Sequence, residues 1–225
     1  MNTTPDLAQQ RFNMIEQQIR PWNVYDPEIR ELLGTMRREN YVPPKHRALA
    51  FFDMEIPLGD GSVPGQVMLA PRVEARILQD LKVRKNESVL EIGTGSGFMA
   101  ALLASRANRV LSLEIDPALA QNAAEALSRN DVDNVEVLHA DGAEPLPGGP
   151  VFDVIVLSGS VAQVPQNLLG SLTMGGRLAA IVGDESMMRM QIITRVDEKR
   201  WTTVEPWDTA APRLLNFPEP SRFRF

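Results

Sequence analysis

The stretch VLEIGTGSGF, residues 89–98, places a run of mostly apolar residues directly before three glycines at alternating positions. The first half has the composition of a buried β-strand. The second half predicts a tight turn, because glycine adopts backbone conformations that other residues avoid. Residues 99–107, which follow, have the apolar pattern of a helix. The stretch therefore predicts a strand, a glycine-rich turn and a helix, an arrangement that binds ligands in many α/β domains.

The spacing of Gly93, Gly95 and Gly97 distinguishes this turn from two common nucleotide-binding motifs. A dinucleotide fingerprint places its third glycine one position later, where this chain has Phe98. A P-loop requires Gly-Lys-Ser/Thr after four intervening residues, and the stretch lacks it. The spacing suits a ligand without a pyrophosphate. S-adenosylmethionine fits that description, because its amino-acid end can lie against such a turn.

Two further strands are followed by carboxylates that fit the same ligand. Glu114 closes a predicted strand at 110–113, where it can accept hydrogen bonds from both ribose hydroxyls. Asp141 follows a third strand, 135–138, where it can receive the adenine amino group. The carboxyl ends of strands in an open parallel sheet meet in one crevice. The predicted cofactor-binding residues are Glu91, Gly93, Thr94, Gly95, Ser96, Gly97, Glu114, Ile115, Asp141 and Gly142.

Short apolar runs alternate with helical stretches from residue 71 onward, and two more strands are predicted at 154–157 and 178–182. Alternating segments at 190–195 and 201–204 predict an antiparallel hairpin at the sheet edge. The predicted fold class is α/β, a Rossmann-like class I methyltransferase fold. Its central sheet is mostly parallel with helices on both faces.

The N-terminal part has a different pattern. Apolar residues at helical spacing predict an amphipathic helix over 7–20 that ends at Pro21, and Asp26 is a predicted N-cap of a second helix. Residues 40–66 are rich in Pro and Gly and are predicted to be irregular. We therefore expect a helical lid with an irregular segment packed on the main domain, a methyltransferase domain, and an extended tail over the surface, at residues 1–70, 71–210 and 211–225.

Composition limits the partners. The formal net charge of −6 disfavours nucleic acid as a partner, because an acidic surface repels phosphates. The chain has no cysteine and only two histidines, which argues against a metal site. No apolar run approaches the roughly 20 residues needed to span a bilayer. We therefore expect a cytoplasmic protein with no nucleic-acid, membrane or metal partner.

Residues 66–183 resemble the protein-L-isoaspartate O-methyltransferases. The segments that carry the resemblance are VLEIGTGSGF at 89–98, HADG at 139–142, FDVIV at 152–156 and GGRL at 175–178, with a similar lead-in at 14–20 and 41–43. The resemblance implies methylation of the α-carboxylate of isoaspartyl residues in damaged proteins or peptides. S-adenosylmethionine would be the methyl donor and S-adenosylhomocysteine the product. The methyl ester would then cyclise to a succinimide that can reopen to aspartate, which makes this a repair reaction.

The chain departs from the family in the segment T-I-S-x-P, which reads Val67-Met68-Leu69-Ala70-Pro71 here. Leu69 replaces the family serine, so no catalytic residue is named. The acceptor-side candidates are Met68, Leu69, Arg72, Ser158 and Ser160. Each has an alternative role as a core residue, a solvated arginine or a turn-capping serine. The departure also leaves open a methyltransferase with another acceptor, or a non-catalytic homologue that binds the cofactor.

Overall fold

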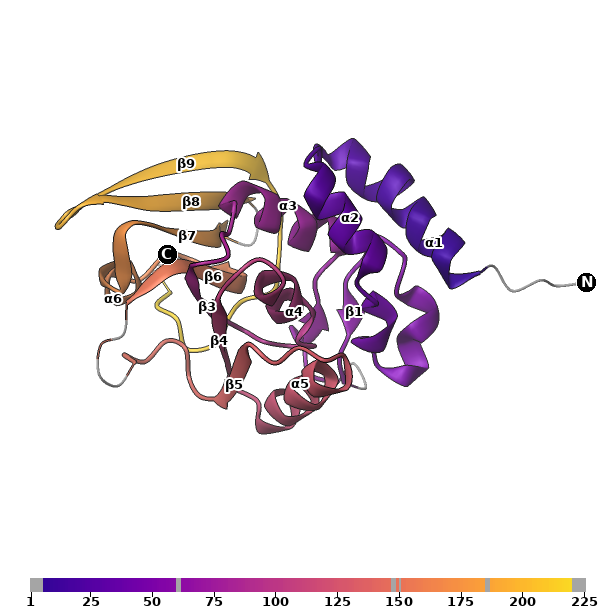
Figure 1. Cartoon of the computed structure of the whole chain (residues 1–225). Helices are drawn as coiled ribbons and strands as arrows, with labels where there is room; N and C mark the ends of the chain where they lie inside the picture. Colours follow the sequence, from indigo (N-terminus) through magenta and orange to yellow (C-terminus); the bar gives the residue numbers. More distant parts are fainter. Residues whose placement is uncertain (1–5, 60–61, 147–148, 150, 185–186, 220–225) are drawn as a thin grey trace, which may run out of the picture.

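The computed structural model describes residues 6–59, 62–146, 149, 151–184 and 187–219. A seven-stranded sheet has the order β5-β4-β3-β6-β7-β8-β9, in which β5 to β7 pair in parallel and the last two strands are antiparallel (Figure 1). The strands are β3 (Ser88–Ile92), β4 (Arg109–Glu114), β5 (Val135–His139), β6 (Phe152–Val161), β7 (Leu172–Asp184), β8 (Met187–Asp197) and β9 (Arg200–Asp208). The predicted fold class and edge hairpin are confirmed.

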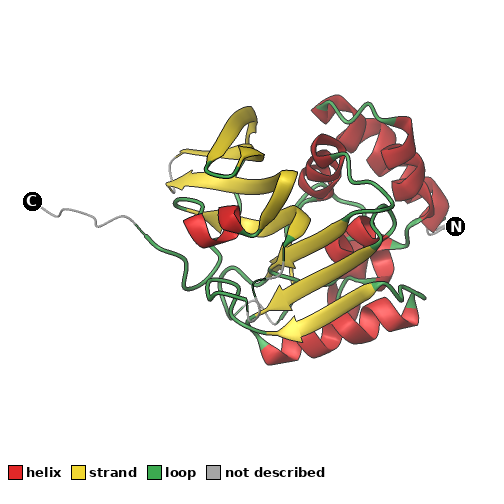
Figure 2. Ribbon diagram, turned by 60° about the vertical axis from the view of Figure 1, so that its left-hand side comes forward, coloured by secondary structure: helices red, strands yellow, loops and turns green. Residues whose placement is uncertain are grey.

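Helices cover the two faces of the sheet (Figure 2). The helices of the main domain are α3 (Pro71–Leu81), α4 (Phe98–Ala104), α5 (Pro117–Arg129) and α6 (Gln166–Gly170). Alternate residues of a strand point to opposite faces. Val154 and Val156 of β6 accordingly pack with α3 and α4, whereas Ile155 and Leu157 pack with α6 and Phe217 of the tail.

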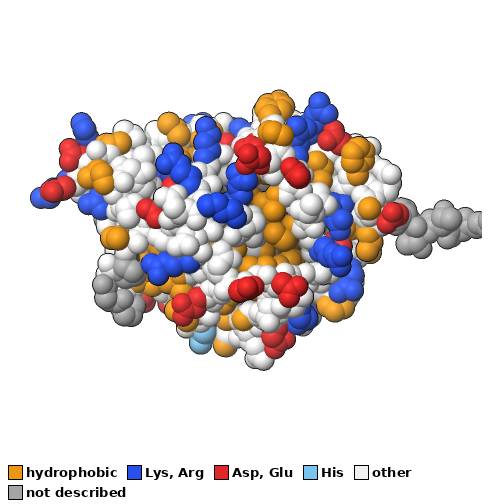
Figure 3. All heavy atoms as spheres, in the orientation of Figure 1, with side chains coloured by type: hydrophobic (Ala, Val, Ile, Leu, Met, Phe, Trp, Pro, Cys, Tyr) orange, Lys and Arg blue, Asp and Glu red, His pale blue; other side chains and the backbone are white. Residues whose placement is uncertain are grey.

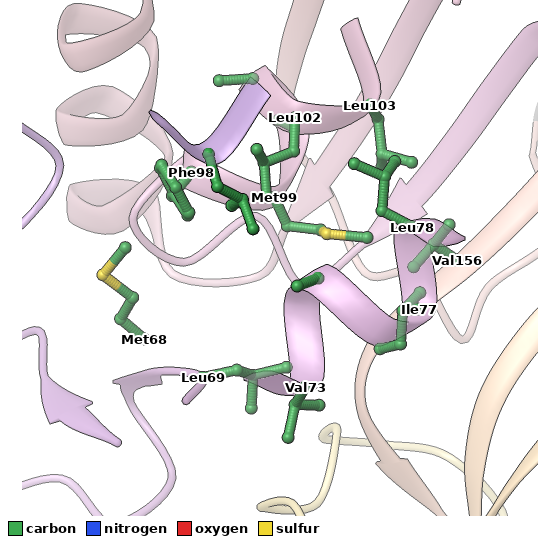
Figure 4. Packing of buried hydrophobic residues seen from close by; sticks show 14 of the residues in the cluster. Met68, Leu69, Val73, Ile77, Leu78, Phe98, Met99, Leu102, Leu103 and Val156 are labelled. Carbon is green, nitrogen blue, oxygen red and sulfur yellow. The ribbon is translucent and has the colours of Figure 1, made fainter. Parts of the chain in front are cut away.

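The first of these faces holds the larger core. Figure 4 shows Ile77 and Leu78 of α3 gathered with Met99 of α4 and Val156 of the sheet. Every residue of α4 is buried, as expected for a helix that is apolar on all sides. The C-terminal end of β3 is therefore held between packed layers, which fixes the position of the glycine turn that follows it.

The described N-terminal part begins with one interrupted helix. The α-helix α1 (Leu7–Met14) continues as the π-helix η1 (Ile15–Ile19) and the 3-10 turn η2 (Arg20–Trp22). The predicted helix over 7–20 is therefore helical throughout, but it is α-helical only as far as Met14. Pro21 lies in the first turn of η2, where the backbone N–H that proline lacks would have no partner within the helix.

The second predicted helix of the N-terminal part is confirmed, together with its cap. Asp26 caps α2 (Pro27–Thr35) by accepting a 2.9 Å hydrogen bond from the backbone N–H of Glu28. The irregular segment contains short elements, namely η3 (Arg38–Asn40), η4 (Pro44–Leu49), β1 (Ile56–Pro57) and β2 (Val67–Met68). β1 and β2 form a small antiparallel pair, which brings the Leu69 segment back to the main sheet.

The described part of the tail, residues 211–219, has no helix or long strand, and it is not confined to the surface as predicted. Ala211 and Phe217 are buried, and Arg213 forms a parallel bridge with Ser160 of β6.

Basic and acidic side chains are interspersed on the face shown in Figure 3, with hydrophobic side chains near its centre. In the described part of the chain, no helix has both the length and the apolar character to cross a membrane.

Candidate active site

A cavity of about 420 Å³ lies at the carboxyl ends of the parallel strands, in the size range of small-molecule sites. The turn after β3, the end of β4 and the turn after β5 form one side of it. The other side is formed by residues 63–67 of the N-terminal part and by residues 213–215 of the tail, with Phe217. The cavity is therefore enclosed by segments far apart in the sequence.

The glycine turn lies against this cavity with an unusual backbone. Gly93 has a φ of +91°, a backbone conformation that residues with a side chain rarely adopt. A Cβ atom at Gly93 would also lie 2.9 Å from Leu214 Cδ2 of the tail. Gly97 has a different role, because it begins α4 and a Cβ there would approach the Ala123 carbonyl of α5 to 3.3 Å. Gly93 therefore allows close approach at the cavity, and Gly97 allows close packing of helices.

Glu114 holds the glycine turn in place from the neighbouring strand. Its side chain is almost fully buried, and Oε2 accepts a 2.8 Å hydrogen bond from the Gly95 N–H. Oε1 accepts a second bond of 3.1 Å from the Asp116 N–H. A carboxylate can accept about four hydrogen bonds. Two accepting positions therefore remain on a carboxylate that lines the cavity.

Asp141 lies in the turn after β5. Its Oδ1 accepts a 2.9 Å hydrogen bond from the Ala143 N–H, and its Oδ2 accepts one of 2.6 Å from Asn216 Nδ2 of the tail. Gly142 packs tightly, because a Cβ there would lie 2.2 Å from Ile92 Cγ2. The carboxylate predicted to receive the adenine amino group thus also fastens the tail.

A chain of buried polar groups lies behind the glycine turn. Thr94 Oγ1 is 2.6 Å from Ser112 Oγ, which donates a 2.7 Å hydrogen bond to Glu91 Oε2. Glu91 Oε1 is 2.7 Å from Ser158 Oγ. Burial raises the pKa of Glu91 to about 8, although the two serine hydrogen bonds lower it. The carboxyl group of Glu91 is therefore largely protonated at neutral pH.

The raised pKa of Glu91 predicts a pH-dependent stability. Between about pH 5 and 8 the folded state binds a proton at Glu91 that the unfolded chain has released, so the free energy of unfolding should fall as pH rises. One group contributes at most about 1.4 kcal/mol per pH unit. Glu91→Gln should make this fall less steep in urea denaturation at several pH values. An unchanged slope would contradict the assignment.

The predicted cofactor-binding residues divide into two groups. Those that line the cavity are Gly93, Gly95, Glu114, Ile115, Asp141 and Gly142. Glu91, Thr94, Ser96 and Gly97 do not line it in the described structure. Ser96 Oγ instead accepts a hydrogen bond from the Phe98 N–H at the start of α4. Gly97 is the N-cap of α4, and Glu91 and Thr94 belong to the buried polar chain.

The acceptor-side candidates also separate. Ser158 lines the cavity and also a gap of about 20 Å³ behind the turn, which Met68 and Leu69 line as well. Arg72 lies in a different cavity, where it pairs with Asp53 and stacks over Trp22. Ser160 is fully buried, and its hydroxyl donates to the Ala211 carbonyl. Of the polar candidates, Ser158 is the one beside the glycine turn.

The tail residues were not among the predicted site residues. Arg213 donates hydrogen bonds to Ser160 Oγ and to the Gly183 carbonyl, and Leu214 lies against the glycine turn. The backbone of Ser160 donates to the Pro212 carbonyl and accepts from the Leu214 N–H. An irregular segment has no periodic pattern that indicates its contacts, so sequence spacing offered no signal for these residues.

Comparison with known proteins agrees with this architecture. The model of the family described as Protein-L-isoaspartate(D-aspartate) O-methyltransferase matches residues 9–207. The chain is similar to Protein-L-isoaspartate O-methyltransferase 1 of Rhodopseudomonas palustris, with 38% identity over 197 residues that cover 86% of this chain and 79% of that one. A second relative, Protein-L-isoaspartate O-methyltransferase 2 of Marinobacter nauticus, is 35% identical over 211 residues, which cover 93% and 94% of the two chains.

The fold is similar to that of solved structures. A Plasmodium falciparum structure described as a protein-L-isoaspartate O-methyltransferase in complex with S-adenosyl-L-homocysteine superposes with a TM-score of 0.74 at 16% identity. That alignment covers 92% of this chain and 97% of that one. A further protein-L-isoaspartate O-methyltransferase structure gives a TM-score of 0.75 at 19% identity and covers 90% of this chain. The family model over residues 9–207 and the relatives of 35% and 38% identity show that the chain belongs to the protein-L-isoaspartate O-methyltransferase family.

Proposed function

We propose that this protein transfers a methyl group from S-adenosylmethionine to the α-carboxylate of isoaspartyl residues in damaged proteins or peptides. The observation that carries the proposal is the cavity at the strand ends, lined by Gly93, Glu114 and Asp141 in a chain of this family. We propose the cytoplasm as the site of action. We also propose that residues 1–70 serve as a lid, 71–210 as the catalytic domain and 211–225 as a closing tail.

The residues around the cavity fit the proposed cofactor. Backbone with positive φ at Gly93 and Gly95 leaves room for the amino-acid end beside the turn. Glu114 has two free accepting positions for ribose hydroxyls. Asp141 can accept from an adenine amino group if it shares or exchanges its bond with Asn216. When bound, the sulfonium supplies an activated methyl group.

The proposed chemistry places few demands on the chain. The acceptor carboxylate oxygen forms a bond to the methyl carbon while the carbon–sulfur bond breaks, and its electron pair stays on sulfur. No proton is transferred, so no general base is required. The chain's residues contribute alignment and exclusion of water, which supply a large share of such rate enhancements. Leu58 and Leu214, which line the cavity from the lid and the tail, provide apolar cover.

Methyl transfer to a defined peptide tests the proposal. Incubation with labelled S-adenosylmethionine and an isoaspartyl peptide should give base-labile label on that peptide. The aspartyl twin should stay unlabelled, because its side-chain carboxylate is one methylene farther from the backbone. Absence of label at high enzyme concentration, with cofactor binding intact by calorimetry, would contradict the proposal and favour a non-catalytic homologue.

Leu69 favours a second candidate, a methyltransferase with a different acceptor. Its side chain is buried beside the gap behind the turn, and it offers no hydrogen bond to a carboxylate. Its backbone carbonyl is independently held by Arg38 Nη2 at 2.7 Å. The side chain can therefore be exchanged while this backbone anchor stays in place.

Leu69→Ser is expected to raise kcat/KM for the isoaspartyl peptide about 10- to 150-fold, since a hydrogen bond to a charged group contributes about 1.5–3 kcal/mol. The matched control is Leu69→Ala, which removes the same apolar volume without adding a hydroxyl. Steady-state transfer rates of both variants give the comparison. Equal rates in the two variants would show that position 69 does not contact the acceptor and would favour the second candidate.

A further inference from the structure

The polar chain behind the glycine turn ends at the cavity. It runs from Thr94 through Ser112 and Glu91 to Ser158, with three successive oxygen–oxygen distances of 2.6, 2.7 and 2.7 Å. Thr94, Ser112 and Glu91 are buried, with exposed fractions of 3%, 0% and 0%, whereas Ser158 is partly exposed and lines the cavity. The Thr94 end of this polar chain is therefore buried, and the Ser158 end is accessible to a ligand in the cavity.

Local backbone geometry puts Ser158 at this place. The pairing of β6 with β7 shifts register between Val156 and Ser160, where four residues of β6 are matched by two of β7. Such bulges redirect side chains and are common next to active sites. The Ser158 backbone carbonyl lies 3.6 Å from the position of a Cβ built on Gly93. Ser158 therefore adjoins the part of the turn expected to hold the amino-acid end of the cofactor.

The number of protons on the four groups decides the direction of the hydrogen bonds along the polar chain. With Glu91 protonated, the four groups carry four protons for three hydrogen bonds, so one proton is left over. If it were left on Thr94, a buried hydroxyl would lack an acceptor, at a cost of about 1–3 kcal/mol. When Glu91 is ionised, Ser158 Oγ donates to Glu91 Oε1. With a proton on Oε1 the same 2.7 Å contact reverses, so that Thr94 donates to Ser112, Ser112 to Glu91 and Glu91 to Ser158, which leaves the free proton on Ser158. That proton faces the cavity.

We propose that Ser158 contacts the substrate and donates a hydrogen bond from Oγ to the acceptor carboxylate, with neutral Glu91 as the positioning residue that frees its proton. The inference rests on the proposed function, because it names a residue that binds the proposed substrate. It also provides a hydroxyl beside the gap that Leu69 lines without one. The hydrogen bond goes to the oxygen that is not methylated, so no proton leaves Ser158 during the transfer.

The charges around Glu91 favour its neutral form. Glu74 of α3 and Glu114 of β4 both raise its pKa, and the charge of Glu74 is compensated by Arg38. When Glu91 ionises, three protons remain for three hydrogen bonds, so Ser158 must donate to Glu91 and can offer only lone pairs to the substrate. An anionic acceptor would then bind poorly. The affinity for the acceptor should fall as pH rises through about 8.

The test is the KM for an isoaspartyl peptide from pH 6.5 to 9.5, measured for the wild type and three variants. Ser158→Ala should raise KM about 10- to 100-fold near pH 7, the size expected for a hydrogen bond to a charged group. Ser158→Thr keeps the hydroxyl and should restore most of the wild-type KM. Glu91→Gln should make KM independent of pH, because an amide donates to Ser158 without titrating. The affinity of Ser158→Ala for S-adenosylhomocysteine should change by a much smaller factor than its KM for the peptide.

The possible failures can be told apart. A wild type that methylates no isoaspartyl peptide overturns the proposed function, and this inference with it. A wild type that methylates the peptide, with an equal KM in Ser158→Ala, overturns the inference alone. So does a Ser158→Ala variant that loses affinity for S-adenosylhomocysteine by the same factor as for the peptide, because the defect is then in the cavity. A pH dependence of KM that persists in Glu91→Gln removes the role given to Glu91.

Discussion

Replacing Arg38 with methionine is expected to lower the free energy of unfolding by about 3–5 kcal/mol, the cost of leaving one partner of a buried ion pair uncompensated. Arg38 and Glu74 are 1% and 3% exposed and are in direct contact through Nη1 and Oε2. Burial raises the pKa of Glu74, and the guanidinium of Arg38 lowers it. Without the arginine, the carboxylate must be buried unpaired or take up a proton.

Arg38 also holds the backbone of the N-terminal part in place, which adds to the expected loss. Its Nε donates to the Ala50 carbonyl at 3.1 Å and its Nη2 donates to the Leu69 carbonyl at 2.7 Å. The guanidinium lies 4.8 Å from the centre of the Phe98 ring at the start of α4. One side chain thus ties together the lid, the Leu69 segment and the helix after the glycine turn.

Urea denaturation at pH 7 measures the effect. The matched control is Arg20→Met, which breaks an exposed ion pair with Glu16 and should cost about 0–1 kcal/mol. The double variant Arg38→Met with Glu74→Leu should recover part of the loss, because it leaves no buried charge. A loss below about 1 kcal/mol in the single variant would show that the pair is not buried in solution.

Glu114→Ala is expected to weaken binding of S-adenosylhomocysteine by roughly 1.5–3 kcal/mol, or about 10- to 150-fold in Kd, the size of hydrogen bonds to a charged group. Two effects act together. The variant removes the oxygens proposed to accept the ribose hydroxyls. It also removes the acceptor of the Gly95 N–H, so the glycine turn loses a fixed point.

Titration calorimetry with S-adenosylhomocysteine measures the change in Kd. Glu125→Ala is the matched control, because it removes a glutamate from the exposed side of α5, where it pairs with Arg129. Its affinity should equal that of the wild type. An unchanged Kd in Glu114→Ala would place the ribose elsewhere and would remove the main support for the proposed orientation of the cofactor.

Much of the fold was predictable because its signals are local. The apolar runs that predicted five parallel strands lie in β3 to β7, and the alternating segments lie in β8 and β9. The Asp26 cap was also predicted correctly, since Asp at the N-cap followed by Pro at the first helical position is a local signal for the start of a helix. The interruption of the first helix at Ile15 was missed, because helical periodicity alone does not distinguish α from π turns.

The sequence by itself determined the α/β architecture and brought Gly93, Glu114 and Asp141 to one edge of the sheet, because strand periodicity and parallel connections depend on neighbouring residues. Three contacts were decided by tertiary structure alone. Arg38 forms an ion pair with Glu74, Asn216 donates a hydrogen bond to Asp141, and Ser158 is the last residue of a buried polar chain that reaches the cavity. These contacts join residues 36 to 75 positions apart. Their partners are selected by burial and packing in the folded chain, which no local pattern encodes.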